Sequence, residues 1–233
     1  MIGTRILKKT KSGYSATKIL KGNDSLEQMS MPGCRYFHII PKEVLMRRRM
    51  IDLGIIVLFM LLALSAGGQT VSRWKDSFPV DKANLTDTGH NPYFILEPGY
   101  CLQLKHGRAT LTITVLSETK IVDGVTTRVV EEREEKNGRL DEISRNFFAI
   151  DRTTLDVYYF GEEVDIYKKG KVVSHEGAWL SGVGGARFGL MMPGRPKVGD
   201  KFYQELAPKI AMDRVEVVAD DVEVKIPAGT FQR

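Results

Sequence analysis

His175 and Glu176 are the residues of this sequence best suited to acid–base chemistry. An imidazole next to a carboxylate can exchange a proton near neutral pH, as a general acid or base must. Ser174 precedes the pair, but adjacent residues of a strand point to opposite faces, so the three do not form a catalytic triad. Two hypotheses follow: the pair serves a hydrolase, or it is a structural pair at the end of a strand.

Metal and cofactor sites are not predicted. The histidines after residue 72 are His90, His106 and His175, and none has a second histidine or a cysteine at the spacing of a zinc site. The acidic residues between 131 and 142 lack the spacing of aspartates and glycine that forms a calcium loop. We therefore expect neither a metal ion nor a cofactor.

The glycine-rich segment 182–189 (GVGGARFG) resembles a phosphate-binding loop only in composition. Arg187 stands where a dinucleotide motif has its third glycine, and no strand and helix flank the segment. It predicts a loop, which would be a lid in the hydrolase hypothesis. Residues 178–199 are the longest irregular stretch expected, and such loops often carry binding residues. Five side chains there could cover the mouth of a barrel or contact a partner: Trp179, Phe188, Leu190, Met191 and Met192.

The elements that must position these residues are strands. Leu111, Ile113 and Val115 alternate with threonines, and the same period of two recurs at residues 155–159 and 222–226. Alternation places one face on a core and the other in water. Turn signals separate these runs at residues 123–124, 137–138, 151–153 and 169–170. The pattern predicts a mainly β domain, an antiparallel meander that forms a curved sheet or an open barrel.

The turn at Asn137 and Gly138 allows a prediction of register. A three-residue loop, 136–138, would set Glu135 opposite Arg139 and Arg133 opposite Asp141. A two-residue loop brings fewer opposite charges together. Because each cross-strand pair contributes about 0.2–1 kcal/mol, charge pairing favours the three-residue loop with a bulge.

Net charge divides the chain into unlike parts. Residues 1–52 carry 11 basic and 4 acidic side chains, residues 53–72 carry none, and residues 73–233 carry 23 and 25, so the total of +5 is the sum of +7, 0 and −2. Basicity confined to the first quarter argues against a nucleic-acid partner. Residues 53–66, from Leu53 to Ala66, are uncharged and apolar, follow three arginines and precede small residues, which is typical of a signal peptide. A retained membrane anchor is the alternative, because the uncharged stretch extends to Ser72.

These features predict four regions. Residues 1–45 are a disordered basic leader or a misassigned start, with Met46 as the alternative first residue; residues 46–68 form the signal peptide or anchor helix; residues 69–90 are a linker; and residues 91–233 form the exported β domain. The strand pattern breaks off near Arg233, which predicts that the domain is incomplete at its C-terminus. Cys34 and Cys101 would lie on opposite sides of the membrane and could not pair, so Cys101 is expected to be a buried structural cysteine.

Three segments together resemble a family of uncharacterised exported bacterial β-rich proteins: residues 91–100 (NPYFILEPGY), 174–179 (SHEGAW) and 226–231 (IPAGTF). The likeness covers most of residues 91–233. More loosely, the last segment is similar to the strand entry of periplasmic proteins with a lipoprotein-carrier-like open barrel. The resemblance implies a bacterial exported domain and no particular activity. Ile95 departs from the family, which often has proline there.

The sequence therefore predicts an exported envelope protein, periplasmic or extracellular, and either released or anchored through residues 53–66. Its domain is expected to be a non-enzymatic binding or scaffold module for an apolar ligand, such as a lipid, or for an envelope protein partner. The alternative is a hydrolase that uses His175 and Glu176 beneath the glycine-rich lid.

Overall fold

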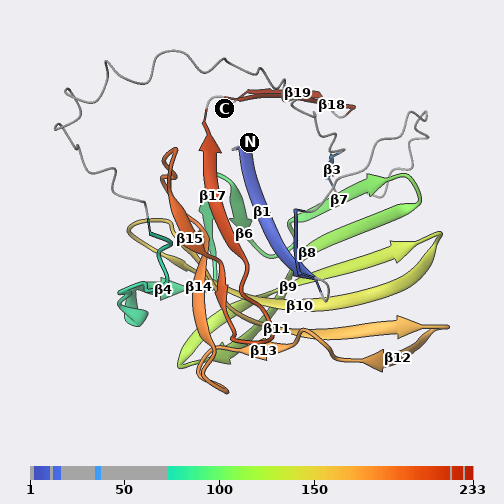
Figure 1. Cartoon of the computed structure of the whole chain (residues 1–233), viewed down its shortest axis with the longest axis horizontal. Coiled ribbons are helices and arrows are strands. Elements are labelled where there is room, and N and C mark those ends of the chain that lie inside the picture. The colour runs from blue at the N-terminus through green and yellow to red at the C-terminus, as the bar shows by residue number, and fades with distance from the viewer. Residues whose placement is uncertain are drawn as a thin grey trace, which may run out of the picture.

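The computed structural model describes residues 3–10, 13–16, 35–37, 73–220, 222–227 and 229–232, and they are built almost entirely of strands (Figure 1). The short 3-10 turn η1 (Lys82–Asn84) is the one helical element among them. The largest sheet is antiparallel over most of its width and curls into a half-barrel. The mainly β class and the curved antiparallel meander are thus confirmed.

The large sheet has the order β16-β14-β11-β10-β9-β8-β7-β3. Five successive strands form its meander: β7 (Cys101–His106), β8 (Ala109–Val122), β9 (Val125–Lys136), β10 (Arg139–Asp151) and β11 (Val157–Lys168). β14 (Arg187–Met192) and β16 (Glu205–Leu206) extend it on one side, and β3 (Arg35–Phe37) lies parallel to β7 on the other. Three short strands pair at the margins, β12 (Lys171–Ser174) and β13 (Trp179–Leu180) with β11 and β4 (Leu85–Thr86) with β10.

A smaller sheet crosses the large one (Figure 1). Its order is β15 (Lys201–Tyr203), β17 (Arg214–Ala219), β1 (Gly3–Thr10) and β2 (Gly13–Ala16). Two separate hairpins complete the described fold, β5 (Gly89–Asn91) with β6 (Phe94–Leu96) and β18 (Glu223–Ile226) with β19 (Gly229–Gln232).

The hairpin between β9 and β10 corrects the predicted register. Asn137 and Gly138 both have positive φ, 54° and 68°, and Lys136 pairs with Arg139, so the loop has two residues and not three. A bulge at Asp141 follows and sets Glu142 opposite Glu134. The turn decides the register because an Asn-Gly pair adopts this conformation at little cost and its twist matches the strands. Cross-strand charge pairing is too weak to override that preference.

The centre of the large sheet is buried on both faces. Adjacent aromatic residues diverge: Phe147 and Tyr158 join one cluster, whereas Phe148 and Tyr159 join the other. The first cluster also contains Phe202 and the buried valines of β17, so it fills the space between the two sheets. Its buried members are Phe78, Leu85, Val122, Val125, Val129, Phe147, Ala149, Tyr158, Phe160, Leu190, Phe202, Leu206, Val215 and Val217. The second cluster, on the opposite face, consists of Leu96, Val115, Val130, Phe148, Ile150, Val157, Tyr159, Trp179, Ala186 and Ala207.

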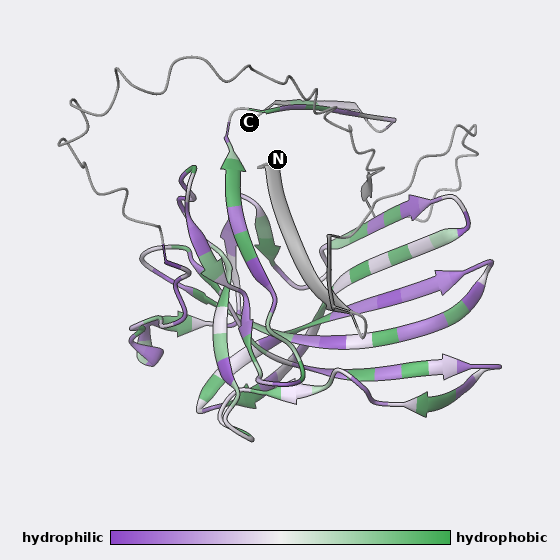
Figure 2. Cartoon of the chain, viewed as in Figure 1, coloured by the Kyte–Doolittle hydropathy of each residue, from purple (hydrophilic) through white to green (hydrophobic). Residues whose placement is uncertain are grey.

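Beyond this doubly packed centre the long strands project as three hairpins, β7–β8, β9–β10 and β11–β12 (Figure 2). Polar and charged residues dominate their outer parts, as in residues 131–136 of β9 (EEREEK). The sheet therefore has a packed half and a polar projecting half.

Residues 73–90 belong to the folded domain, which corrects the predicted linker. Phe78 and Leu85 are buried in the first cluster, and β4 pairs with β10. The side-chain amide of Asn84 donates to Asp151 Oδ1 at 2.9 Å and to Thr153 Oγ1 at 3.1 Å. This amide belongs to the Asn-Leu-Thr sequence that matches a glycosylation sequon, so in the folded domain the nitrogen that would carry a glycan is already hydrogen-bonded.

Several predictions fall on residues outside the described ranges, including the apolar segment 53–66 and Cys34. The prediction of a disordered leader over residues 1–45 is wrong for its described parts, because β1, β2 and β3 are strands and pair within the two sheets. Within the described part of the chain, no helix has the length and apolar character needed to cross a membrane. Cys101 is disulfide-bonded and only partly buried, so the prediction of a buried cysteine is wrong.

Candidate functional site

His175 lies just after β12 and turns back against β11. Its Nδ1 atom is 2.9 Å from Asp165 Oδ1 and 2.8 Å from the carbonyl oxygen of Val164. The side chain is 70% exposed, which leaves the other ring nitrogen accessible from solvent. The carboxylate that the structure places against this imidazole is Asp165, and not Glu176, whose backbone N–H donates to Ser174 Oγ. The predicted pair is corrected because neighbours in the chain diverge while a neighbouring strand supplies the partner.

Asp165 connects His175 to a row of charges that crosses strands β8 to β11 of the large sheet. Its Oδ2 atom is 3.6 Å from Arg145 Nη1, and Arg145 Nε is 3.6 Å from Glu131 Oε2. Lys120 forms an ion pair with Glu163, which lies opposite Arg145 in the ladder. Strands β8 to β11 each contribute to this row, so the sheet itself sets the spacing of the charges.

A shallow pocket of about 260 Å³ opens among these side chains. It is lined by Arg145, Glu163, Val164, Asp165, His175 and Ala178. A guanidinium, two carboxylates and an imidazole therefore surround a small apolar floor, an arrangement suited to a polar or charged group. No serine, threonine or cysteine lines this pocket, so a side-chain nucleophile of those types is lacking within it.

Sequence reasoning found His175 but missed Asp165, Arg145 and Glu131. The turn at Lys169 and Gly170 was recognisable, and regular pairing from it would place Ser174 opposite Asp165. A bulge between Ile166 and Tyr167 instead sets Ser174 opposite Ile166 and moves His175 alongside Asp165. The sequence carries no clear signal for that bulge.

The apolar residues assigned to a partner-binding loop lie in strands. Trp179 is in β13 and only 4% exposed, and its Nε1–H donates to Glu205 Oε2 at 3.1 Å. Leu190 is 6% exposed in β14, and Phe188 stacks on Phe160. Met191 and Met192 pack against the second cluster. The prediction of an irregular stretch is wrong for residues 187–192, since they form β14, which pairs with β11 and β16.

The glycine-rich loop after β13 is tied to the turn between β8 and β9. Ser181 Oγ donates to Asp123 Oδ2 at 2.9 Å, and Lys82 Nζ lies 2.8 Å from Asp123 Oδ1. Partial burial raises the pKa of Asp123, but the hydrogen bonds from Lys82 and Ser181 outweigh it and lower the pKa overall. A Cβ at Gly182 would meet this carboxylate at 3.3 Å, so the loop presents negative charge where a phosphate site needs the opposite.

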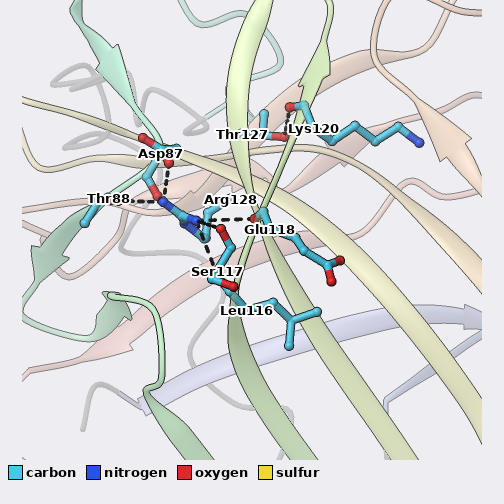
Figure 3. A network of polar contacts seen from close by, with 8 residues as sticks. All are labelled: Asp87, Thr88, Leu116, Ser117, Glu118, Lys120, Thr127 and Arg128. Carbon is cyan, nitrogen blue, oxygen red and sulfur yellow. Dashed lines mark hydrogen bonds and ion pairs between the residues drawn. The ribbon is translucent and has the colours of Figure 1, made fainter.

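Arg128 forms a second polar network, buried beneath the β4–β5 connection (Figure 3). The side chain of Arg128 is only 7% exposed. Its guanidinium forms an ion pair with Asp87 and donates a hydrogen bond to Thr88 Oγ1 at 2.9 Å. The other side of the guanidinium donates to the backbone carbonyls of Ser117 at 2.7 Å and Glu118 at 3.3 Å. These carbonyls converge because β8 bulges between Val115 and Thr119. The network is structural: it satisfies the carbonyls of the bulge and fixes residues 87–88 over the sheet.

Asp151 gives the fold an acid-sensitive contact. Its Oδ1 atom accepts hydrogen bonds from the backbone N–H groups of Thr153 at 2.7 Å and Thr154 at 2.8 Å, and from Asn84. Burial raises the pKa of this carboxyl, but the three hydrogen bonds outweigh burial and lower it.

We expect the free energy of unfolding to fall as the pH drops below about 4, the ordinary pKa of an aspartate. A lowered folded-state pKa means that the stabilisation is complete above the unfolded-state pKa and is lost as the pH falls through the folded-state value. Urea denaturation at pH 7 and pH 3 measures this loss, and Asp151→Ala should lower stability at pH 7 and reduce the pH dependence. An Asp151→Ala variant with the full wild-type pH dependence would contradict the assignment.

Metal binding has no visible basis in the described residues, where no group of three histidine, cysteine, aspartate or glutamate side chains is placed to hold an ion.

Comparisons with protein-family models, with curated proteins and with solved structures find no match to this chain.

Proposed function

We propose that this chain is an exported or membrane-anchored envelope protein whose β domain binds a protein partner without catalysing a reaction. The observation that carries the proposal is the projecting half of the large sheet, where the pocket beside His175 opens within a row of charged side chains. Arg145 is 37% exposed and its two ion pairs are long, at 3.6 Å, so the guanidinium can exchange them for a partner's carboxylate. Export and membrane attachment rest on residues 53–66 and on the resemblance of residues 91–231 to exported bacterial proteins.

A protein partner is favoured over an apolar small ligand. The space between the two sheets is occupied by the first cluster, in which Phe147, Phe160 and Phe202 are each no more than 3% exposed. A lipid in that space would have to displace a packed core, which costs several kcal/mol. The charged projecting surface, by contrast, is accessible without rearrangement.

Photocrosslinking in the native host tests the proposal. A benzoylphenylalanine in place of the exposed Glu176 is expected to form one discrete protein adduct, and that adduct should disappear in an Arg145→Glu background. The matched control places the same probe at Lys169, at the exposed tip of the same hairpin. Equal labelling from positions 176 and 169, or labelling of lipid alone, would argue against a protein-binding surface here.

A hydrolase remains the second candidate because His175 and Asp165 have the geometry of a general base and its orienting carboxylate. If the pair is catalytic, His175→Ala should lower turnover of chromogenic esters or phosphates by about 100-fold or more. The binding proposal expects any such background turnover to be equal in the wild-type protein and in His175→Ala.

A further inference from the structure

β12 forms a free edge of the large sheet. It pairs with β11 on one side, and no backbone hydrogen bond from another described segment reaches its other side. Figure 1 shows β12 as the outermost strand, below β11. A free edge presents unpaired N–H and C=O groups to any extended chain that lies beside it. The described fold therefore has a place where another strand can be added.

The turn before β12 decides which of its backbone groups point outward. Both residues of the turn have positive φ, 53° and 75°, and Lys168 pairs with Lys171 across them, so this is a two-residue hairpin turn. In such a hairpin the first pair exchanges hydrogen bonds, whereas the next pair does not. The next pair is Tyr167 and Val172. The N–H and C=O groups of Val172 therefore point away from β11.

Two successive valines make this edge apolar. Val172 is 42% exposed and Val173 is 56% exposed. Among the exposed large apolar side chains of the described chain, they are the only two that are neighbours in the sequence. A strand laid beside β12 would cover both valines, so apolar burial would add to the backbone hydrogen bonds.

The charge beside this edge is positive and unbalanced. Lys168 and Lys171 lie directly opposite each other in the ladder, and Lys169 lies in the turn between them. All three are exposed, and no carboxylate of the described residues forms an ion pair with any of them. Like charges directly opposite each other destabilise a strand pair. A carboxylate supplied from outside the domain would relieve this repulsion.

The same lysines argue against a second copy of this chain as the occupant. Two β12 edges paired with each other would bring the three lysines of each copy together. Lysine on an edge strand is a common protection against such self-pairing. This protection does not act against a strand that carries carboxylates, which the lysines attract.

We propose that an extended, acidic segment of the partner protein adds to β12 as a new strand of the large sheet. The inference rests on the proposed function, since it states how the partner that binds beside His175 is held. Hydrogen bonds to the backbone of Val172 fix the segment, its apolar side chains cover Val172 and Val173, and its carboxylates lie beside the lysines. From Val172 the segment runs toward His175 and not around the turn, where the chain reverses direction.

A defined peptide tests the strand addition. The probe is a fluorescein-labelled octapeptide of alternating glutamate and valine, and fluorescence anisotropy follows its binding to the full chain. We expect it to bind about tenfold more tightly than a lysine–valine peptide of the same length, because of the lysines.

A second peptide removes the backbone donors without altering the protein. It has the same glutamate–valine sequence, but every backbone nitrogen is methylated, so it has the same charge and cannot donate to the edge. We expect its affinity to be lower by about tenfold or more, since each lost hydrogen bond contributes about 0.5–1.5 kcal/mol. Equal binding of the methylated and unmethylated peptides would leave charge attraction as a sufficient explanation and overturn the inference.

Two variants locate the binding on β12. Val172→Pro removes the outward N–H at a position that donates no hydrogen bond to β11, and it should weaken binding of the glutamate–valine peptide by about tenfold. The matched control, Val172→Thr, keeps the N–H and should weaken binding by less than about threefold. An unchanged melting temperature shows that each variant folds. Equal effects of the two substitutions contradict the proposal.

The native partner separates failure of this inference from failure of the proposed function. In the host, Val172→Pro should abolish the adduct formed from position 176. An adduct that persists in Val172→Pro defeats only the strand addition, whereas the absence of any discrete adduct in the wild-type background defeats the proposed function. Sedimentation velocity tests the remaining occupant: a wild-type dimer that dissociates in Val172→Pro would identify a second copy on this edge and overturn the inference.

Discussion

Replacing Arg128 by methionine should lower the free energy of unfolding by about 3–5 kcal/mol, the usual cost of removing one partner of a buried ion pair. Asp87 would lose its cation, and the carbonyls of Ser117 and Glu118 would lose the hydrogen bonds that the guanidinium donates. Since domains of this size are stable by about 5–15 kcal/mol, such a loss brings the protein near the edge of folding. Urea denaturation followed by the fluorescence of Trp179 measures it.

Arg145→Met is the control for this prediction. Arg145 also forms two ion pairs, but it is 37% exposed and both distances are 3.6 Å, so its removal should cost no more than about 1 kcal/mol. Similar losses for the two variants would mean that the contacts of Arg128 do not stabilise the bulge in β8.

Gly161→Ala should be the second strongly destabilising change, with a cost of about 2–6 kcal/mol. Gly161 has a φ of +135°, a conformation that costs a residue with a side chain about 1–3 kcal/mol. An added Cβ would also lie 2.3 Å from the carbonyl oxygen of Trp179 and 2.9 Å from Leu180 Cα, so β13 would have to move, at a further cost of about 1–3 kcal/mol. Thermal melting gives the size of the loss, and a red shift of Trp179 emission would report the displacement of β13.

Gly170→Ala separates the two causes. Gly170 also has a positive φ, +75°, but no atom lies within 4 Å of its added Cβ. Only the conformational cost applies there, about 1–2 kcal/mol. If Gly161→Ala proved as mild as Gly170→Ala, close approach of β13 to β11 would not be a constraint on this fold.

The meander could be predicted from the sequence because its signals are local. Leu111, Ile113 and Val115 alternate, and the turns at Asp123 and Asn137 consist of residues that readily take positive φ. Burial of both sheet faces was harder to foresee. Phe147 and Phe148 are adjacent and both buried, so this stretch of strand does not alternate between apolar and polar residues. The two faces of the sheet there are covered by segments that lie far along the chain.

The candidate site could be predicted only in part, for a related reason. His175 was recognisable by its residue type, but its partner Asp165 depends on a bulge in the β11–β12 hairpin. Arg128 presents the same difficulty, because its partners lie in the bulge of β8 and in residues 87–88, about forty positions away. Bulges shift register by one residue, and one residue is enough to exchange the neighbours of every side chain beyond it.

The joining of the two sheets by one cluster has a consequence for the order in which the domain can form. A chain emerges from the ribosome with its N-terminus first, and β7 to β11 can pair in that order, each with the strand just completed. Phe202, Val215 and Val217, which cover the inner face of those strands, arrive only after a further thirty to fifty residues. Until then the apolar face of the meander stands open, so this stage is the one at which the chain is most prone to aggregate.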